Sequence, residues 1–168
     1  PVILRGQFHA RISQRVGDPL YVTALAIETE GEDGDRVIFA ACDRVSVSLP
    51  IQTRIREALR DRLPDFDPAK LVMNATHTHT AQELEEGIYP PQGPEVMTPT
   101  ECADAFVPLA VEAIAQAWEQ RRPGQVAWAY SHAVVGHNRR VTYAGGMSKM
   151  YGATDVPDFE HIEGYEDH

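Results

Sequence analysis

The stretch "VIFAACDRVSVSLPIQTRIREALRDRLPDFDPAKLVMNATHTH", residues 37–79, has an apolar run at each end of an amphipathic segment. Residues 37–42 and 70–74 are short and rich in β-forming side chains, which is typical of buried strands. Residues 49–64 carry arginines opposite an apolar stripe, and a proline stands near each end, so they predict a helix. The stripe is formed by Ile51, Ile55, Ala58, Leu59 and Leu63. The order strand, helix, strand indicates an α/β fold.

A further apolar run, "LYVTALAI" at residues 20–27, precedes this unit. The Gly- and Asp-containing residues 28–36 join it to the 37–42 strand and predict an exposed turn. Both runs are nearly continuous rather than alternating, so we expect strands covered on both faces. The fold class predicted is therefore α/β, a mixed β-sheet flanked by helices.

A second helix is expected to begin after Thr98, because residues 98–101 resemble a capping box with proline at the first helical position. Its apolar face would be Ala103, Phe106, Val107, Ala110, Val111, Ile114 and Trp118. Pro108 lies inside this pattern, and we expect it to bend the helix or interrupt its hydrogen bonds.

Three other segments complete the chain. Residues 81–97 are rich in Pro and Gly and predict a long loop, either functional or a mobile insertion. Residues 126–135, "VAWAYSHAVV", predict another strand, whereas the tail from residue 150 has almost no core-forming run. The chain, residues 1–168, is therefore expected to be an incomplete part of a larger domain.

Composition excludes several classes of protein. A formal charge of −10, with acidic runs at residues 28–35 and 163–168, disfavours binding to nucleic acid. No apolar stretch approaches the roughly 20 residues of a transmembrane helix. The 2 cysteines are too few for a disulfide scaffold, and Cys42 is expected to be an unreactive core thiol.

The most informative polar residues are His77 and His79, which follow the 70–74 strand. Residues two apart in a strand point to the same face, and ligand sites form at the carboxyl edge of open α/β sheets. Such a pair can supply two zinc ligands, or one ligand and one acid–base group. Asp43 follows the neighbouring strand, where it is either a hydrogen-bond acceptor for a site group or an acid in the first turn of the helix.

Five segments resemble the neutral/alkaline (non-lysosomal) ceramidase family, in particular its bacterial ceramidase-like members. They are "DPLYVTALAIE", "FAACDRVSVS", "NATHTHTA", "GHNRRV" and "MYGATDVPDFEHIEGYED", in this order. The resemblance implies a zinc-dependent hydrolase in which His77 is a metal ligand and His79 is a catalytic group that relays protons. It also implies that Arg139 lies in the active site and contacts substrate, with Asn138 beside it.

The resemblance carries further expectations. It covers essentially the whole chain and implies that residues 1–168 are the N-terminal portion of the family's catalytic domain. The remaining zinc ligands, a His, a Glu and a Tyr, would come from downstream of residue 168, so this chain alone is expected to be inactive. Family members usually continue after the histidines with Ser-Gly-Pro, whereas this chain has Thr80, Ala81 and Gln82. We therefore expect hydrolysis of an amide or ester bond in a small-molecule or lipid-like substrate rather than of ceramide specifically. Secretion or a periplasmic location is also implied.

A different class of function stays open. The same fold could serve as a non-catalytic carbohydrate- or lipid-binding domain that has lost the metal. The substitution His77→Ala separates the two hypotheses. It should abolish hydrolysis by the full-length protein if His77 binds zinc, because only the hydrolase needs an imidazole that binds zinc.

Overall fold

The computed structural model describes residues 1–31 and 34–164, so the two acidic runs lie partly outside the described residues. The chain forms two compact units, Pro1–Pro123 and Gly124–His168, and each is described by itself. Whether both belong to one catalytic domain stays a prediction. Among the described residues, no helix combines the length and the apolar character needed to cross a membrane.

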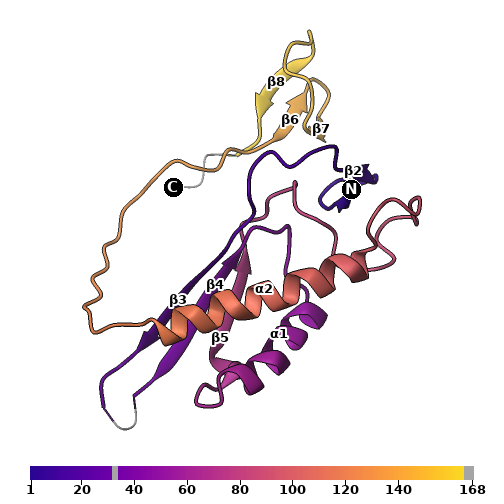
Figure 1. Ribbon diagram of the computed structural model, residues 1–168. Coiled ribbons are helices and arrows are strands. Elements are labelled where there is room, and N and C mark those ends of the chain that lie inside the picture. The colour runs from indigo at the N-terminus through magenta and orange to yellow at the C-terminus, as the bar shows by residue number, and fades with distance from the viewer. Residues whose placement is uncertain (32–33, 165–168) are drawn as a thin grey trace. The chain divides into compact units, whose positions relative to one another are not determined.

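A three-stranded mixed sheet is the centre of the first unit (Figure 1). Its strands are β3 (Val22–Glu28), β4 (Arg36–Cys42) and β5 (Leu71–Ala75), in the order β3-β4-β5. β3 pairs antiparallel with β4, while β4 pairs in parallel with β5, as a strand–helix–strand unit requires. The predicted α/β fold class, a mixed sheet flanked by helices, is confirmed.

Two helices cover one face of this sheet, α1 (Leu49–Arg62) and α2 (Pro99–Glu119) (Figure 1). Four of the five residues of the predicted α1 stripe are buried, whereas Ala58 is exposed. All seven residues expected on the apolar face of α2 are buried. The helices therefore bury their apolar stripes against each other and against the inner side chains of β4, Ile38, Ala40 and Cys42.

The N-terminus of α2 confirms the predicted capping box. The Thr98 hydroxyl accepts a hydrogen bond from the Glu101 amide at 3.2 Å, and the Glu101 carboxylate accepts one from the Thr98 amide at 2.8 Å. The helix continues past Pro108 as one uninterrupted α-helix to Glu119. Pro108 itself is exposed, so its ring faces away from the core.

The opposite face of the sheet corrects one expectation. Leu25, Phe39 and Val72 lie directly across from one another on the three strands, and they are 58%, 44% and 47% exposed. The prediction that these strands are covered on both faces is therefore wrong for the described chain. An apolar run does not distinguish a covered face from an open one, because both faces here carry apolar side chains.

Two further elements belong to the first unit. The strands β1 (Ile3–Leu4) and β2 (Arg11–Ile12) form a short antiparallel hairpin, and the 3-10 helix η1 (Pro68–Lys70) precedes β5. The predicted 81–97 loop forms no helix and no strand longer than an isolated bridge. It is nevertheless anchored to β1, because Arg5 forms an ion pair of 2.5 Å with the buried carboxylate of Glu83. The loop is therefore attached by an ion pair to the residue that follows β1, and whether it is functional or a mobile insertion stays open.

The second unit contains β6 (Arg140–Tyr143), β7 (Met147–Met150) and β8 (Phe159–Ile162), in the order β7-β6-β8. One expectation was wrong here, because residues 126–135 form no strand among the described residues. The tail forms β8, but none of its described residues from 150 to 164 is buried, which confirms that it has almost no core-forming run. The side chains of Trp128 and Tyr130 are 90% and 85% exposed. An apolar sequence becomes a strand only where a neighbouring strand supplies hydrogen bonds, and 126–135 has none in this part of the structure.

Two leucines of α1 provide a matched test of the core. Leu59 is completely buried and Leu49 is 72% exposed. We expect Leu59→Ala to lower the free energy of unfolding by about 2–5 kcal/mol because it leaves a cavity, and Leu49→Ala to change it by less than about 0.5 kcal/mol. Urea denaturation followed by circular dichroism measures both, and equal losses would contradict the packing described.

The two cysteines are expected to be unreactive in the folded chain. Burial raises the pKa of the Cys42 thiol to about 11 and also raises the pKa of the Cys102 thiol. Since only thiolates react readily with disulfide reagents, we expect both to react slowly at pH 8 and rapidly after denaturation. The absorbance of a chromogenic disulfide reagent measures this, and fast labelling of the native chain would show that the core is open.

Candidate functional site

The candidate site of the first unit lies at the carboxyl edge of β4 and β5. These strands run in parallel with Cys42 opposite Ala75, so the residues after them emerge side by side. The Thr76 amide donates a hydrogen bond of 3.0 Å to the Cys42 carbonyl, which extends the pairing by one step. The prediction that the two histidines follow the carboxyl end of a strand is confirmed.

Asp43 connects the ends of all three strands. Its carboxylate accepts hydrogen bonds from the Tyr21 amide at 3.0 Å and from the Thr76 hydroxyl at 3.1 Å. The first turn of α1 contains no acidic residue, so the interpretation of Asp43 as a helix-turn acid is wrong. Asp43 instead holds Thr76, the residue directly before the first histidine.

His77 has an unusual backbone conformation and a defined hydrogen bond. Its φ of 65° lies in the left-handed region, which is uncommon for residues other than glycine and is often found at functional sites. The Nδ1 atom of the ring lies 2.8 Å from the Val45 carbonyl oxygen. A carbonyl oxygen only accepts hydrogen bonds, so Nδ1 carries a proton, and in the neutral form of the ring the lone pair is on Nε2. His77 is exposed, which leaves it accessible to a ligand.

The imidazole of His79 lies beside that of His77. The two ring centroids are 4.9 Å apart, with the rings at 73° to each other. The histidines therefore come together as predicted, although they lie beyond β5 and the turn at His77 brings them together rather than strand alternation.

The backbone of the N-terminal segment packs on His79. A Cβ placed on Gly6 would lie 2.5 Å from Cγ of His79, and Gly6 has a φ of +113°, so only glycine fits at this position. The Tyr89 hydroxyl holds the segment by accepting from the Gly6 amide at 3.2 Å and donating to the Gln7 carbonyl at 2.7 Å. The guanidinium of Arg11 also donates to the His79 carbonyl.

The described residues do not complete a metal centre. Within 1–31 and 34–164, no group of three or more His, Cys, Asp and Glu side chains is arranged to hold a metal ion. The imidazole of His77 is a ligand type that zinc accepts, with Nδ1 used by the hydrogen bond to Val45, but a zinc site needs further ligands. The predicted role of His77 in zinc binding therefore stays a prediction.

Asn138 and Arg139 belong to the second unit and precede β6. The Arg139 guanidinium donates to the Tyr151 hydroxyl at 2.5 Å and lies 4.8 Å from the centre of that ring. The Asn138 side chain accepts a hydrogen bond of 3.0 Å from the Arg140 amide. Their predicted association with the histidines and with substrate stays a prediction, because the two units are described separately.

A large groove adjoins the histidine edge in the first unit. It has a volume of about 1080 Å³, and its lining includes Asp43, Arg44, Thr80 and Gln82. The sequence analysis did not identify Arg44, which is only 7% exposed. The one sequence signal for a site residue was its position directly after Asp43 at a strand end. Arginine at such a position is ordinarily exposed to solvent, so its burial was not predicted.

Comparison of the chain with protein-family models, with curated proteins and with solved structures finds no match.

The role of Asp43 leads to a stability prediction. We expect Asp43→Asn to lower the free energy of unfolding by about 1–3 kcal/mol, because an asparagine amide group cannot accept both of the hydrogen bonds that the carboxylate accepts. Asp61→Asn is the control, since Asp61 is an exposed acid of α1. Urea denaturation of both variants tests this, and equal effects would mean that the carboxylate does not hold the strand ends together.

Proposed function

We propose that this chain supplies the histidine pair of a zinc-dependent hydrolase that cleaves an amide or ester bond, as the resemblance to ceramidase-like proteins suggests. The observation that carries the proposal is the hydrogen bond between Nδ1 of His77 and the Val45 carbonyl. Histidines that bind metals usually donate their other ring N–H to a backbone carbonyl or a carboxylate, which fixes the tautomer and orients the ring. The ring of His77 has this arrangement, with Nδ1 bound to the Val45 carbonyl.

In this proposal His77 binds zinc through Nε2, and the remaining ligands come from outside the described residues. Bound zinc polarises a carbonyl group and lowers the pKa of a coordinated water to about 7. The left-handed backbone of His77 supports the proposal independently, because such a conformation costs of order 1–3 kcal/mol and tends to persist at functional positions.

His79 is the proposed proton-transfer group. An imidazole has an unperturbed pKa of about 6.5, so it can accept and return a proton near neutral pH. Its ring lies 4.9 Å from that of His77 and is packed by Gly6, so it is held close to the proposed zinc ligand. A leaving amine or alcohol needs a proton, and His79 is placed to supply one.

Arg139 and Asn138 are proposed as substrate-binding residues, with Arg139 also assisting catalysis. This part of the proposal rests on the resemblance of the segment "GHNRRV". A guanidinium can stabilise an oxyanion that develops during acyl transfer, and an amide can bind a substrate hydroxyl. The proposed substrate is a small or lipid-like molecule. Export from the cell is also proposed, because the resemblance to ceramidase-like proteins implies it.

A non-catalytic lipid- or carbohydrate-binding domain is the second candidate. It is favoured by the groove of about 1080 Å³. Such a domain needs a lined cavity but no zinc. The two candidates therefore differ in whether the His77 imidazole contributes to metal affinity.

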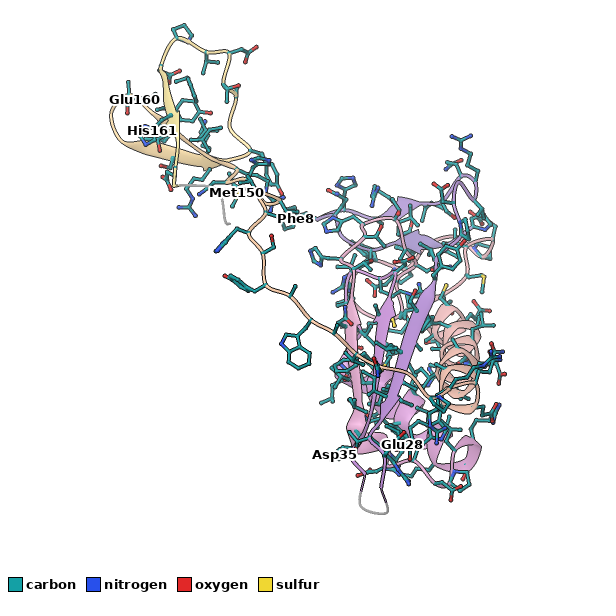
Figure 2. The ribbon with its side chains drawn as sticks, turned by 90° about the vertical axis from the view of Figure 1, so that its left-hand side faces the viewer. Phe8, Glu28, Asp35, Met150, Glu160 and His161 are labelled. Atoms are coloured by element: carbon teal, nitrogen blue, oxygen red, sulfur yellow. The ribbon has the colours of Figure 1, made fainter. Side chains whose placement is uncertain are left out.

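Zinc affinity of the tag-free full-length protein, in which ligands from outside the described residues can complete the site, tests the proposal. We expect the wild type to bind zinc in competition with a chromophoric chelator, and His77→Ala to weaken binding by about tenfold or more, because one ligand is lost. His161→Ala is the matched control, since His161 is an exposed histidine on β8 in the second unit (Figure 2). Equal affinities of the wild type and His77→Ala would exclude His77 as a ligand and favour the binding domain.

A further inference from the structure

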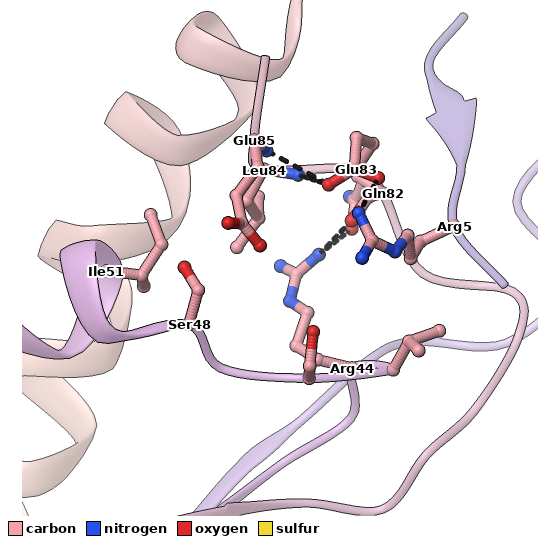
Figure 3. Close-up of a pocket in the computed structure, with 10 residues that line it drawn as sticks. Arg5, Arg44, Ser48, Ile51, Gln82, Glu83, Leu84 and Glu85 are labelled. Carbon is pink, nitrogen blue, oxygen red and sulfur yellow. Dashed lines mark hydrogen bonds and ion pairs between the residues drawn. The ribbon is translucent and has the colours of Figure 1, made fainter. Parts of the chain in front are cut away.

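Arg44 carries a buried positive charge that forms no direct ion pair with a carboxylate of the described residues. The residue is 7% exposed, and none of the ion pairs between described side chains includes it. Its guanidinium donates to the side-chain oxygen of Gln82, as Figure 3 shows, and lies 4.2 Å from the centre of the Phe106 ring. Both partners are neutral.

The neighbouring acids are already engaged. Glu83 binds Arg5 at 2.5 Å and also accepts hydrogen bonds from the Leu84 and Glu85 amides at 2.9 and 3.0 Å (Figure 3). Asp43 accepts from the Tyr21 amide and the Thr76 hydroxyl, as described above.

The guanidinium of Arg44 therefore has no direct ion-pair partner among the described carboxylates, and only the charge of the adjacent Asp43 acts favourably on it. Burial lowers the pKa of Arg44 from its ordinary value, but a guanidinium stays protonated in proteins. A buried charge without an opposite charge is costly, and such charges are normally paired. A bound anion would remove this cost.

The groove beside Arg44 is large enough for such a ligand and is mostly apolar. Its volume of about 1080 Å³ is at the upper end of ordinary small-molecule sites. Aliphatic and aromatic side chains form most of its wall, among them Leu4, Ile12, Val16, Leu20, Phe106 and Leu109.

A second arginine with an unused donor lines the same groove. Nε of Arg11 is buried and has no hydrogen-bond partner in the described structure, although its Nη2 donates to His79. Arg15 lines the groove as well. Three arginines thus face a cavity whose walls are otherwise largely apolar.

We propose that this groove binds a small organic carboxylate with an aliphatic body, whose carboxylate is held by Arg44 and Arg11. Planar guanidinium groups match a carboxylate in geometry and charge, and the apolar wall accepts the aliphatic part. Asp18 and Asp43 also line the groove, and they disfavour a dianion such as phosphate. The inference does not depend on zinc binding by His77.

Calorimetric titration of the full chain with hexanoate and with its neutral analogue hexanamide tests the proposal. A metal chelator is present, so that carboxylate binding to zinc is not counted. We expect saturable binding of hexanoate, about tenfold or more tighter than that of hexanamide, because the charge-assisted hydrogen bonds are lost in the amide. Acetate should bind more weakly than hexanoate, since it lacks the aliphatic body.

Variants identify the residues responsible. Arg11→Gln should lose most of the preference for hexanoate over hexanamide, and Arg60→Gln, which removes an exposed charge of α1, should keep it. Arg44→Gln should lose the preference if it folds, as judged by circular dichroism. If Arg44→Gln does not fold, Arg11→Gln alone tests the proposal. Arg11 is less buried than Arg44, so its substitution should disturb folding less.

Three results would overturn the proposal. One is the absence of saturable hexanoate binding, and another is an undiminished preference for hexanoate in Arg11→Gln. The third is displacement of hexanoate by inorganic phosphate at equal or lower concentration, which would indicate a general anion site without a contribution from the apolar wall.

Discussion

Parallel hydrogen bonding between β4 and β5 determines where the candidate functional groups of the first unit lie. With Cys42 opposite Ala75, the next residues, Asp43 and Thr76, leave the sheet at one edge and bind each other. A parallel pair needs a long crossover, and α1 supplies it while burying Ile55 and Leu59 on the sheet. A register slip of one residue would reverse the faces of β5 and separate these groups.

Two oppositely charged side chains, Asp43 and Arg44, leave the same edge of the sheet and bind different partners. Asp43 and Arg44 are consecutive, yet the carboxylate binds the strand ends while the guanidinium is buried beneath the 81–97 loop beside Gln82. The carboxylate of Asp43 thereby joins the strand ends, and the guanidinium of Arg44 is left without a direct ion pair among the described residues. Because a charge buried in this way is costly, its retention indicates a function more strongly than an exposed arginine would.

Local patterns in the sequence predicted the elements that depend on local interactions. The strand–helix–strand unit, the apolar face of α2 and the capping box at Thr98 follow from periodicity and end signals, and all are present. Residues 126–135 were predicted wrongly because a strand depends on a distant partner. The burial of Arg44 and the left-handed turn at His77 likewise arise from tertiary packing and left no clear pattern.

Arg11 links the histidine pair to the groove. Its Nη2 holds the carbonyl of His79, while its Nε is unused and its side chain lines the cavity. An anion bound at Arg11 would therefore act on the same side chain that fixes the backbone of the proposed proton-transfer residue. The imidazole of His77 is bound by the carbonyl of Val45, and Val45 directly follows Arg44, the other proposed carboxylate ligand. An anion held by Arg11 and Arg44 would therefore act on His79 through the hydrogen bond from Arg11 and on His77 through the backbone that follows Arg44. Occupation of the groove should thus alter both the proposed proton transfer and the proposed zinc affinity.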